Sequence, residues 1–229
     1  ALGGVVELTG GLGSGKSRLV REFAALVRGS EDPPIYLYGR CREFEDQRPC
    51  QPVLSLLYRY LLLPPGSAPG EREREILTRL LPREECETLL AALDPTFEGA
   101  TAVPVPVALT AFLASLAGRG PLVLFLDDIT WADEGTLELL ARLTESLPGI
   151  ALLLILGRRT HTEPRRPKAL ARFLERIGRL PFRESIELRP LQLDAVQDLV
   201  DDHFASTVPR VRLAQVLYER SRGNPGMIA

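Results

Sequence analysis

An octapeptide near the start of the chain, Gly10 to Ser17, has the sequence GGLGSGKS. Its residue types and spacing fit the phosphate-binding pattern G-x-x-x-x-G-K-[ST]. Glycines let consecutive backbone N–H groups turn toward one anion without Cβ clashes, and a following helix adds its positive N-terminal end. In this interpretation Lys16 contacts the β- and γ-phosphates of a nucleotide, and Ser17 supplies a hydroxyl to Mg²⁺.

The sequence on both sides of this loop supports the interpretation. A short apolar run, Val5–Leu8, precedes it, and apolar residues recur at helical spacing from Leu19 to Val27 before Gly29. This strand, loop and helix order is the context that phosphate binding needs, whereas a glycine-rich turn that binds nothing does not need it. The residues expected to contact the nucleotide are Gly10, Gly11, Leu12, Gly13, Ser14, Gly15, Lys16, Ser17 and Arg18.

A pair of acidic residues, Asp127 and Asp128, follows the continuous apolar run Leu122–Leu126, which is typical of a strand buried on both faces. On a strand neighbouring the phosphate loop, Asp127 would hold Mg²⁺ opposite Ser17. Asp128 would then orient a water molecule for attack on the γ-phosphate. The alternative is that both acids only cap the next helix. However, Asp133 and Glu134 lie nearer to the start of that helix and suffice for the cap.

Two arginines, Arg158 and Arg159, come directly after the next apolar run, Ile150–Leu156. A guanidinium at that strand end could contact the γ-phosphate and respond to its loss on hydrolysis. We take Arg158 as the candidate, and the sequence leaves open both Arg159 and a purely solvated role for either side chain.

An α/β fold is expected to position these residues, because strand-like runs alternate with helix-like segments as in a parallel sheet with right-handed crossovers. We predict a helical insertion over residues 41–120, between the second and third strands. Beyond Pro190 the pattern is purely helical. We therefore expect a nucleotide-binding domain over residues 1–189 and the start of a helical lid domain over residues 190–229. The five predicted strands are Val5–Leu8, Ile35–Tyr38, Leu122–Leu126, Ile150–Leu156 and Ser185–Leu188.

The composition argues against several classes of protein. The formal net charge of −2 disfavours a surface built to attract nucleic acid or anionic membranes. The apolar runs are too short to span a bilayer, and no N-terminal signal pattern is visible. The three cysteines lack metal-ligand spacing and are interpreted as reduced thiols. We expect a cytoplasmic protein, and we expect this chain to contact neither nucleic acid nor membrane.

Three segments of the chain resemble a known family: GGLGSGKSRLVREF at the loop, DDITWADEGTLELL from Asp127 to Leu140, and RGNPGMIA near the end. They are similar to the signal-transduction ATPases with numerous domains (STAND). The most similar branch is the AAA-like ATPase module of large LuxR-type bacterial transcription regulators, also found beside adenylate cyclase and protein kinase domains. The resemblance covers nearly the whole chain, and Trp131-Ala132-Asp133 is its most specific part.

The resemblance implies a P-loop ATPase fold, with a five-stranded parallel sheet in the order 5-1-4-3-2 flanked by helices. It implies a Mg²⁺-dependent switch between ATP and ADP, and a Gly-x-Pro segment near the nucleotide base. That segment corresponds to Gly223 and Pro225, and Pro225 is the expected contact. The implied partners are the nucleotide, effector domains of the same chain, and further copies in the ATP state. The chain opens directly on its first strand, which suggests a piece of a longer protein.

Our leading hypothesis is an ATPase switch that slow hydrolysis resets. A nucleotide-binding scaffold without turnover is the alternative from another class, and a regulatory ATPase module of a cyclase or protein kinase is also open. A small-molecule kinase is less favoured because of the Asp127-Asp128 pair. Specificity for GTP is disfavoured, because Asn224 is the only asparagine and the guanine-reading Asn-Lys-x-Asp motif cannot be formed.

Overall fold

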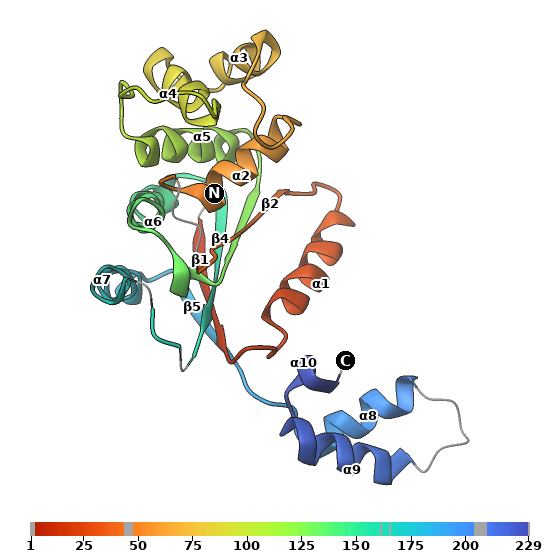
Figure 1. Ribbon diagram of the computed structural model, residues 1–229. Helices are drawn as coiled ribbons and strands as arrows, with labels where there is room; N and C mark the ends of the chain where they lie inside the picture. The colour runs from red at the N-terminus through yellow and green to blue at the C-terminus, as the bar shows by residue number, and fades with distance from the viewer. Residues whose placement is uncertain (1–2, 44–47, 161, 165, 204–209, 229) are drawn as a thin grey trace.

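A five-stranded parallel sheet forms the centre of the protein in a computed structural model that describes residues 3–43, 48–160, 162–164, 166–203 and 210–228 (Figure 1). The strand order is β2-β3-β4-β1-β5, and every neighbouring pair is parallel. This is the predicted order 5-1-4-3-2, read from the opposite edge. The strands are β1 (Gly4–Gly10), β2 (Ile35–Arg40), β3 (Leu122–Asp127), β4 (Leu152–Arg159) and β5 (Arg183–Leu188).

The central strands are buried on both faces, as their continuous apolar sequences predict. All six residues of β3 are buried, whereas β5, at one edge of the sheet, is largely exposed. Alternate residues of β3 pack on opposite sides: Leu124 belongs to the large core, and Phe125 belongs to a smaller core that contains Val20. The alternation defines two faces with different helical cover.

Helix α1 (Lys16–Arg28) covers one face of the sheet, and α6 (Glu134–Ser146) and α7 (Pro167–Gly178) cover the other (Figure 1). Val20 of α1 packs in the smaller core, while Leu140 of α6 and Phe173 of α7 pack in the larger one. The start of α6 is capped as expected, because Asp133 accepts a hydrogen bond from the backbone N–H of Thr136 at 2.8 Å. Short 3₁₀ turns, Ile129–Trp131 and Leu147–Gly149, flank α6.

Four helices connect β2 to β3: α2 (Gln51–Tyr60), α3 (Glu71–Thr78), α4 (Arg83–Leu93) and α5 (Val105–Arg119). In Figure 1 they lie above the sheet, next to β2 and α6, and α3 and α4 are farthest from the sheet. Tyr58 and Tyr60 are partly buried against the large core. The buried residues of these helices belong to the same large hydrophobic core as those of β3 and β4.

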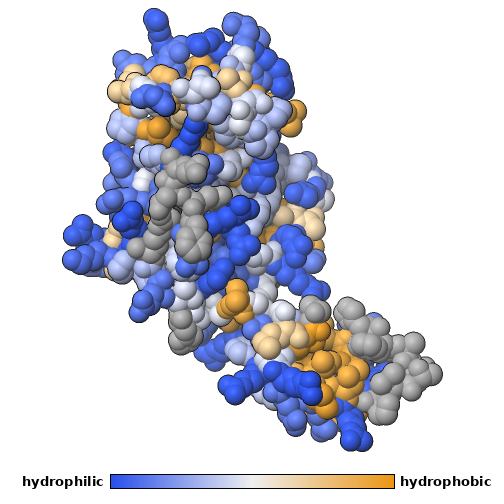
Figure 2. All heavy atoms as spheres, in the orientation of Figure 1, coloured by the Kyte–Doolittle hydropathy of each residue, from blue (hydrophilic) through white to orange (hydrophobic). Residues whose placement is uncertain are grey.

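The last three helices, α8 (Leu193–His203), α9 (Arg210–Ser221) and α10 (Pro225–Ile228), form a separate small cluster. Their own core contains Val196, Val200 and Ala214. Figure 2 shows apolar surface over this part of the molecule, where Val211 and Met227 are exposed. In the described part of the chain, no helix combines the length and apolar composition needed to cross a membrane.

Candidate functional site

The phosphate loop connects the end of β1 to the first residue of α1, so its backbone lies at the N-terminal end of a helix. Lys16 is buried, and its Nζ donates to the carbonyl oxygen of Gly10 at 2.9 Å and to that of Gly11 at 3.0 Å. Burial lowers the pKa of Lys16, and the nearby charges of Asp127 and Asp128 partly oppose this effect. The loop therefore surrounds an ammonium group held at its centre.

Ser17 and Asp127 meet across the sheet edge, where Ser17 Oγ donates to Asp127 Oδ2 at 2.6 Å. The strand that carries Asp127 does not pair with β1, because β4 lies between them. The intervening position on β4 is Gly157, and a Cβ atom there would lie 2.6 Å from Asp127 Oδ1. The missing side chain leaves room for Asp127 to extend toward the start of α1.

Asp128 is held by two arginines from neighbouring strands. Arg159 donates through Nε to Oδ1 at 2.8 Å and through Nη2 to Oδ2 at 2.7 Å, and Arg40 donates through Nη2 to Oδ2 at 2.9 Å. Burial would raise the pKa of Asp128, but the hydrogen bonds from Arg159 and then Arg40 outweigh it and lower the pKa below its ordinary value. Asp128 is therefore an ionised carboxylate that two guanidinium groups orient.

The structure brings Arg159, rather than Arg158, to this site. Alternate residues of β4 face opposite sides, and Arg159 shares the α1 face with Ile155. Arg158 faces the other side, where its Nε donates to Glu7 at 2.8 Å and Arg183 contacts the same carboxylate. Arg158 is the candidate taken from the sequence, with Arg159 left open, and it is Arg159 that lies beside Asp128.

The C-terminal segment contacts the phosphate loop through one backbone amide and one side-chain amide. Gly226 N donates to the carbonyl oxygen of Gly13 at 2.9 Å, and Asn224 Nδ2 donates to that of Leu12 at 2.8 Å. A Cβ atom on Gly226 would lie 2.7 Å from Gly13 Cα, so the two glycines permit this close approach. Pro225, the residue expected near the nucleotide, begins α10 beside this contact.

One cavity of about 310 Å³ joins these groups. Among the described lining residues, three predicted site residues are missing: Gly10, Gly11 and Arg158. Gly10 and Gly11 instead accept hydrogen bonds from Lys16 through their carbonyl oxygens. The lining contains the predicted site residues Leu12, Gly13, Ser14, Gly15, Lys16, Ser17, Arg18, Asp127, Asp128 and Pro225, together with Arg21, Arg40, Arg159 and Gly226.

Sequence reasoning did not identify Arg40, Asn224 or Gly226 as site residues. A signal for Arg40 exists, because it ends β2 and is the register partner of Asp127 on β3. Carboxyl ends of parallel strands meet at one edge, so an arginine there could have been placed beside the acidic pair. Asn224 and Gly226 flank Pro225 in the segment already singled out.

The oxygens of Ser17 and Asp127 fit a Mg²⁺ site. Magnesium prefers oxygen ligands, and it binds through one or two protein groups, with phosphate oxygens and waters completing its shell. The 2.6 Å hydrogen bond shows that these two oxygens already converge on one point at the mouth of the loop.

The sequence profile of the AAA ATPase domain matches residues 2–156, which is more than half of the chain. The chain belongs to the AAA ATPase domain family. As a member of it, this chain is a nucleotide-binding module of the P-loop ATPase type. A comparison of this chain with curated proteins found no match.

Two solved structures share the fold of this AAA ATPase domain. The Aeropyrum pernix ORC2 protein in its ADPNP-ADP complexes matches with a TM-score of 0.52 and 15% identity, covering 100% of this chain and 54% of that one. The ADP form of the same protein matches with a TM-score of 0.51 and 14% identity, covering 100% and 55%. At this identity the likeness shows the fold alone, and the domain spans about half the length of the ORC2 protein.

Proposed function

We propose that this AAA ATPase domain is a regulatory switch that binds ATP with Mg²⁺ and hydrolyses it slowly to ADP and phosphate. It would act in the bacterial cytoplasm, within a larger signalling or transcription-regulator protein of the STAND class. The observation that carries the proposal is the cavity lined jointly by the phosphate loop, the two aspartates and the lid residues Pro225 and Gly226.

Binding of the nucleotide rests on the loop and on the end of β3. Lys16 exchanges its loop carbonyl contacts for phosphate oxygens, and the glycine-rich backbone supplies N–H donors at the helix N-terminus. Ser17 and Asp127 would hold Mg²⁺. When bound, the ion neutralises part of the phosphate charge.

Hydrolysis would depend on Asp128 and Arg159. The lowered pKa of Asp128 keeps its carboxylate ionised at neutral pH, so that it can accept a hydrogen bond from a water molecule in line with the γ-phosphate. Arg159 lines the same cavity beside Asp128, so its guanidinium can contact the γ-phosphate and lose that contact when phosphate is released. The pair therefore links water positioning to sensing of the product state.

The switch itself would be the contact between the lid and the loop. Gly226 and Asn224 bind the backbone of Gly13 and Leu12, so any change in the loop on nucleotide binding reaches α10 directly. A ligand shifts such an equilibrium only by contacting one state better than the other. We propose that ATP and ADP favour different positions of residues 190–229, and that effector domains or further copies respond to that position.

A scaffold that binds nucleotide without hydrolysing it is the second candidate. The hydrogen bonds that Arg40 and Arg159 both donate to Asp128 favour it. Both carboxylate oxygens already accept hydrogen bonds from guanidinium groups, and Arg40 and Arg159 reduce the basicity of Asp128. Such a carboxylate could serve to position the arginines alone. The same site would also suit a regulatory module beside a cyclase or protein kinase.

Two measurements test the proposal in sequence. Calorimetric titration with Mg-ATP and with ADP should show binding to the wild type and to Lys168→Ala, and none to Lys16→Ala. Lys168 is the only other lysine and is exposed, so it is the matched control. Phosphate release should then fall in Asp128→Asn relative to the wild type. Binding with equal release by both proteins would favour the scaffold, and no heat with either nucleotide would contradict the switch.

A further inference from the structure

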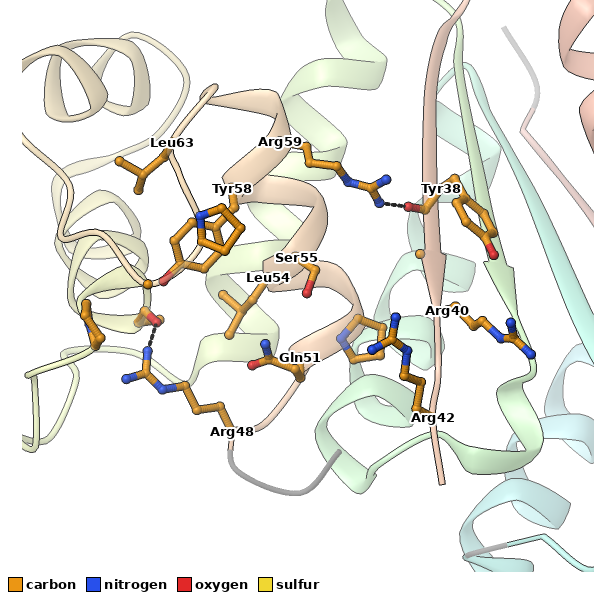
Figure 3. Close-up of a pocket in the computed structure, with 16 residues that line it drawn as sticks. Tyr38, Arg40, Arg42, Arg48, Gln51, Leu54, Ser55, Tyr58, Arg59 and Leu63 are labelled. Carbon is orange, nitrogen blue, oxygen red and sulfur yellow. Dashed lines mark hydrogen bonds between the residues drawn. The ribbon is translucent and has the colours of Figure 1, made fainter. Parts of the chain in front are cut away.

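A second and larger cavity, of about 880 Å³, lies between the end of β2 and the helices that follow it (Figure 3). Its walls include Leu54, Tyr58 and Leu63, so part of its surface is apolar. Among the described residues that line it, four are arginines and none is acidic. The arginines come from three different segments: Arg40 and Arg42 at the end of β2, Arg48 before α2, and Arg59 within α2.

Two of these arginines are held by neutral groups. Arg48 Nη1 donates to the carbonyl oxygen of Ala92 at 3.0 Å, and Arg59 donates to that of Tyr38 (Figure 3). Within the described residues neither forms an ion pair. Asp94, beyond Ala92, accepts hydrogen bonds from Thr96 that lower its pKa, and the charge of Arg48 adds only a smaller effect. The carbonyl contacts fix both side chains at the wall without cancelling their charge.

Arg40 lines this cavity as well as the smaller one at the phosphate loop. Its Nε and Nη2 donate to Asp128 Oδ2 at 3.1 and 2.9 Å, and 48% of its side chain is exposed. In Figure 3 its guanidinium is turned away from the larger cavity. An anion in that cavity and the carboxylate of Asp128 would compete for the same guanidinium.

We propose that the larger cavity binds a small organic anion with a phosphate or carboxylate group and an apolar body, and that this anion draws Arg40 away from Asp128. Guanidinium groups recognise both kinds of oxyanion through paired hydrogen bonds. The volume is within the range of small-molecule pockets, and the Leu54, Tyr58 and Leu63 wall suits an apolar body. The bound anion changes nucleotide affinity, and this second step rests on the proposed nucleotide function.

The binding step is tested with 1-naphthyl phosphate as the anionic probe and 1-naphthol as its neutral analogue, by calorimetry on the whole chain. The background variant Lys16→Ala removes the phosphate loop as a competing site. We expect the phosphate to bind this variant and the naphthol not to bind. Adding Arg48→Gln and Arg59→Gln should weaken binding at least about fivefold, whereas Arg142→Gln with Arg179→Gln, two exposed arginines paired with glutamates, should not.

Equal affinity in the Arg48/Arg59 and Arg142/Arg179 variants would overturn the proposal, as would the absence of binding to the Lys16→Ala protein. Should the glutamine pair fail to fold by circular dichroism, Arg48→Lys with Arg59→Lys replaces it. Lysine keeps the charge but loses the paired donors, so the same loss of affinity is expected.

The coupling step is tested by measuring the ADP dissociation constant with and without saturating 1-naphthyl phosphate. We expect a change of about fivefold or more in the wild type, which is typical of coupling between two sites, and no change in Arg40→Ala. A wild-type change that persists in Arg40→Ala would overturn the role of Arg40. If the wild type binds the probe but no nucleotide, the nucleotide function fails while the anion site stands.

Discussion

Arg159 and Asp128 form a two-point ion pair, with Nε 2.8 Å from Oδ1 and Nη2 2.7 Å from Oδ2. The side chains of Asp128 and Arg159 are only 5% and 19% exposed, so solvent screens this pair weakly. Arg158, one residue earlier, lies on the opposite face of β4 and binds Glu7 instead. The two neighbouring arginines therefore bind different carboxylates on opposite faces of the sheet.

Replacing Arg159 by alanine should slow release of phosphate from ATP by about 10- to 100-fold, since hydrogen bonds to charged groups contribute about 1.5–3 kcal/mol. Arg158→Ala should instead lower the free energy of unfolding and affect the rate less. Steady-state phosphate release and urea unfolding of both variants distinguish these effects, with the exposed Arg142→Ala as control. A larger loss of rate in Arg158→Ala than in Arg159→Ala would contradict the assignment.

Glu7 should make stability depend on pH. Its side chain is 4% exposed, and burial would raise its pKa, but hydrogen bonds from Arg183 and Arg158 outweigh burial and lower the pKa below 4.5. A carboxylate whose pKa is lowered in the folded state stabilises the protein at any pH above its ordinary pKa. This stabilisation is lost as the pH falls through the folded-state pKa. Glu7→Gln removes the titrating group and is the matched comparison.

At pH 7 we expect Glu7→Gln to lower the free energy of unfolding by about 2 kcal/mol, because it breaks a buried ion pair whose arginines are partly exposed. Urea unfolding from pH 7 to pH 3 should show this difference shrinking below about pH 4.5, the ordinary pKa. A difference that stays constant down to pH 3 would mean that the Glu7 carboxylate does not carry the effect.

The contact between Gly226 and Gly13 should not tolerate a side chain. In Gly226→Ala the added methyl would lie 2.7 Å from Gly13 Cα, so α10 must move from the loop. Hydrogen exchange of the Gly226 amide should accelerate, and the effect of ADP on exchange in residues 190–203 should diminish. Gly118→Ala, where no atom lies within 4 Å of an added Cβ, is the control and should leave both unchanged. Unaltered exchange in Gly226→Ala would argue against the lid contact.

Gly157→Ala should weaken binding of Mg-ATP by about tenfold, equivalent to about 1.4 kcal/mol, because the new Cβ would displace Asp127 from Ser17. That Cβ would lie 2.6 Å from Asp127 Oδ1. Binding of ATP in the presence of a chelator should change less, since Asp127 is proposed to act through the metal. Calorimetry with and without Mg²⁺ provides the measurement, and Gly149→Ala, with open space around it, is the control. An equal loss under both conditions would indicate general damage to the site.

The motifs that lie within one short segment could be predicted from sequence. The phosphate loop and the Asp127-Asp128 pair need only local spacing and a flanking strand to be recognised, and short apolar runs were enough to place all five strands. The parallel order of the sheet is confirmed. The boundaries at residues 41–120 and 190–229 remain predictions, as does the catalytic role of each site residue.

Contacts between distant segments could be predicted only where the strand ends bring two motifs to one edge of the sheet, as for Ser17 and Asp127. Asn224 and Leu12 are 212 residues apart, and no local pattern relates them. Arg40 and Asp128, 88 residues apart, are related only through the order of their strands. The larger cavity likewise depends on how residues 48–66 fold back over the end of β2. These features exist only once the helices that follow β2 have packed beside the sheet and residues 224–226 have reached the phosphate loop.

A phosphate loop, an acidic pair and an arginine at 158 or 159 could be assigned to one sheet edge from the sequence alone. Which of the two arginines faces Asp128 depends on the packing of α1. Because β4 is apolar on both faces, its sequence has no alternation to show which side α1 will cover. Once α1 packs on the face that includes Ile155, the two-residue period of the strand places Arg159 beside Asp128 and Arg158 beside Glu7.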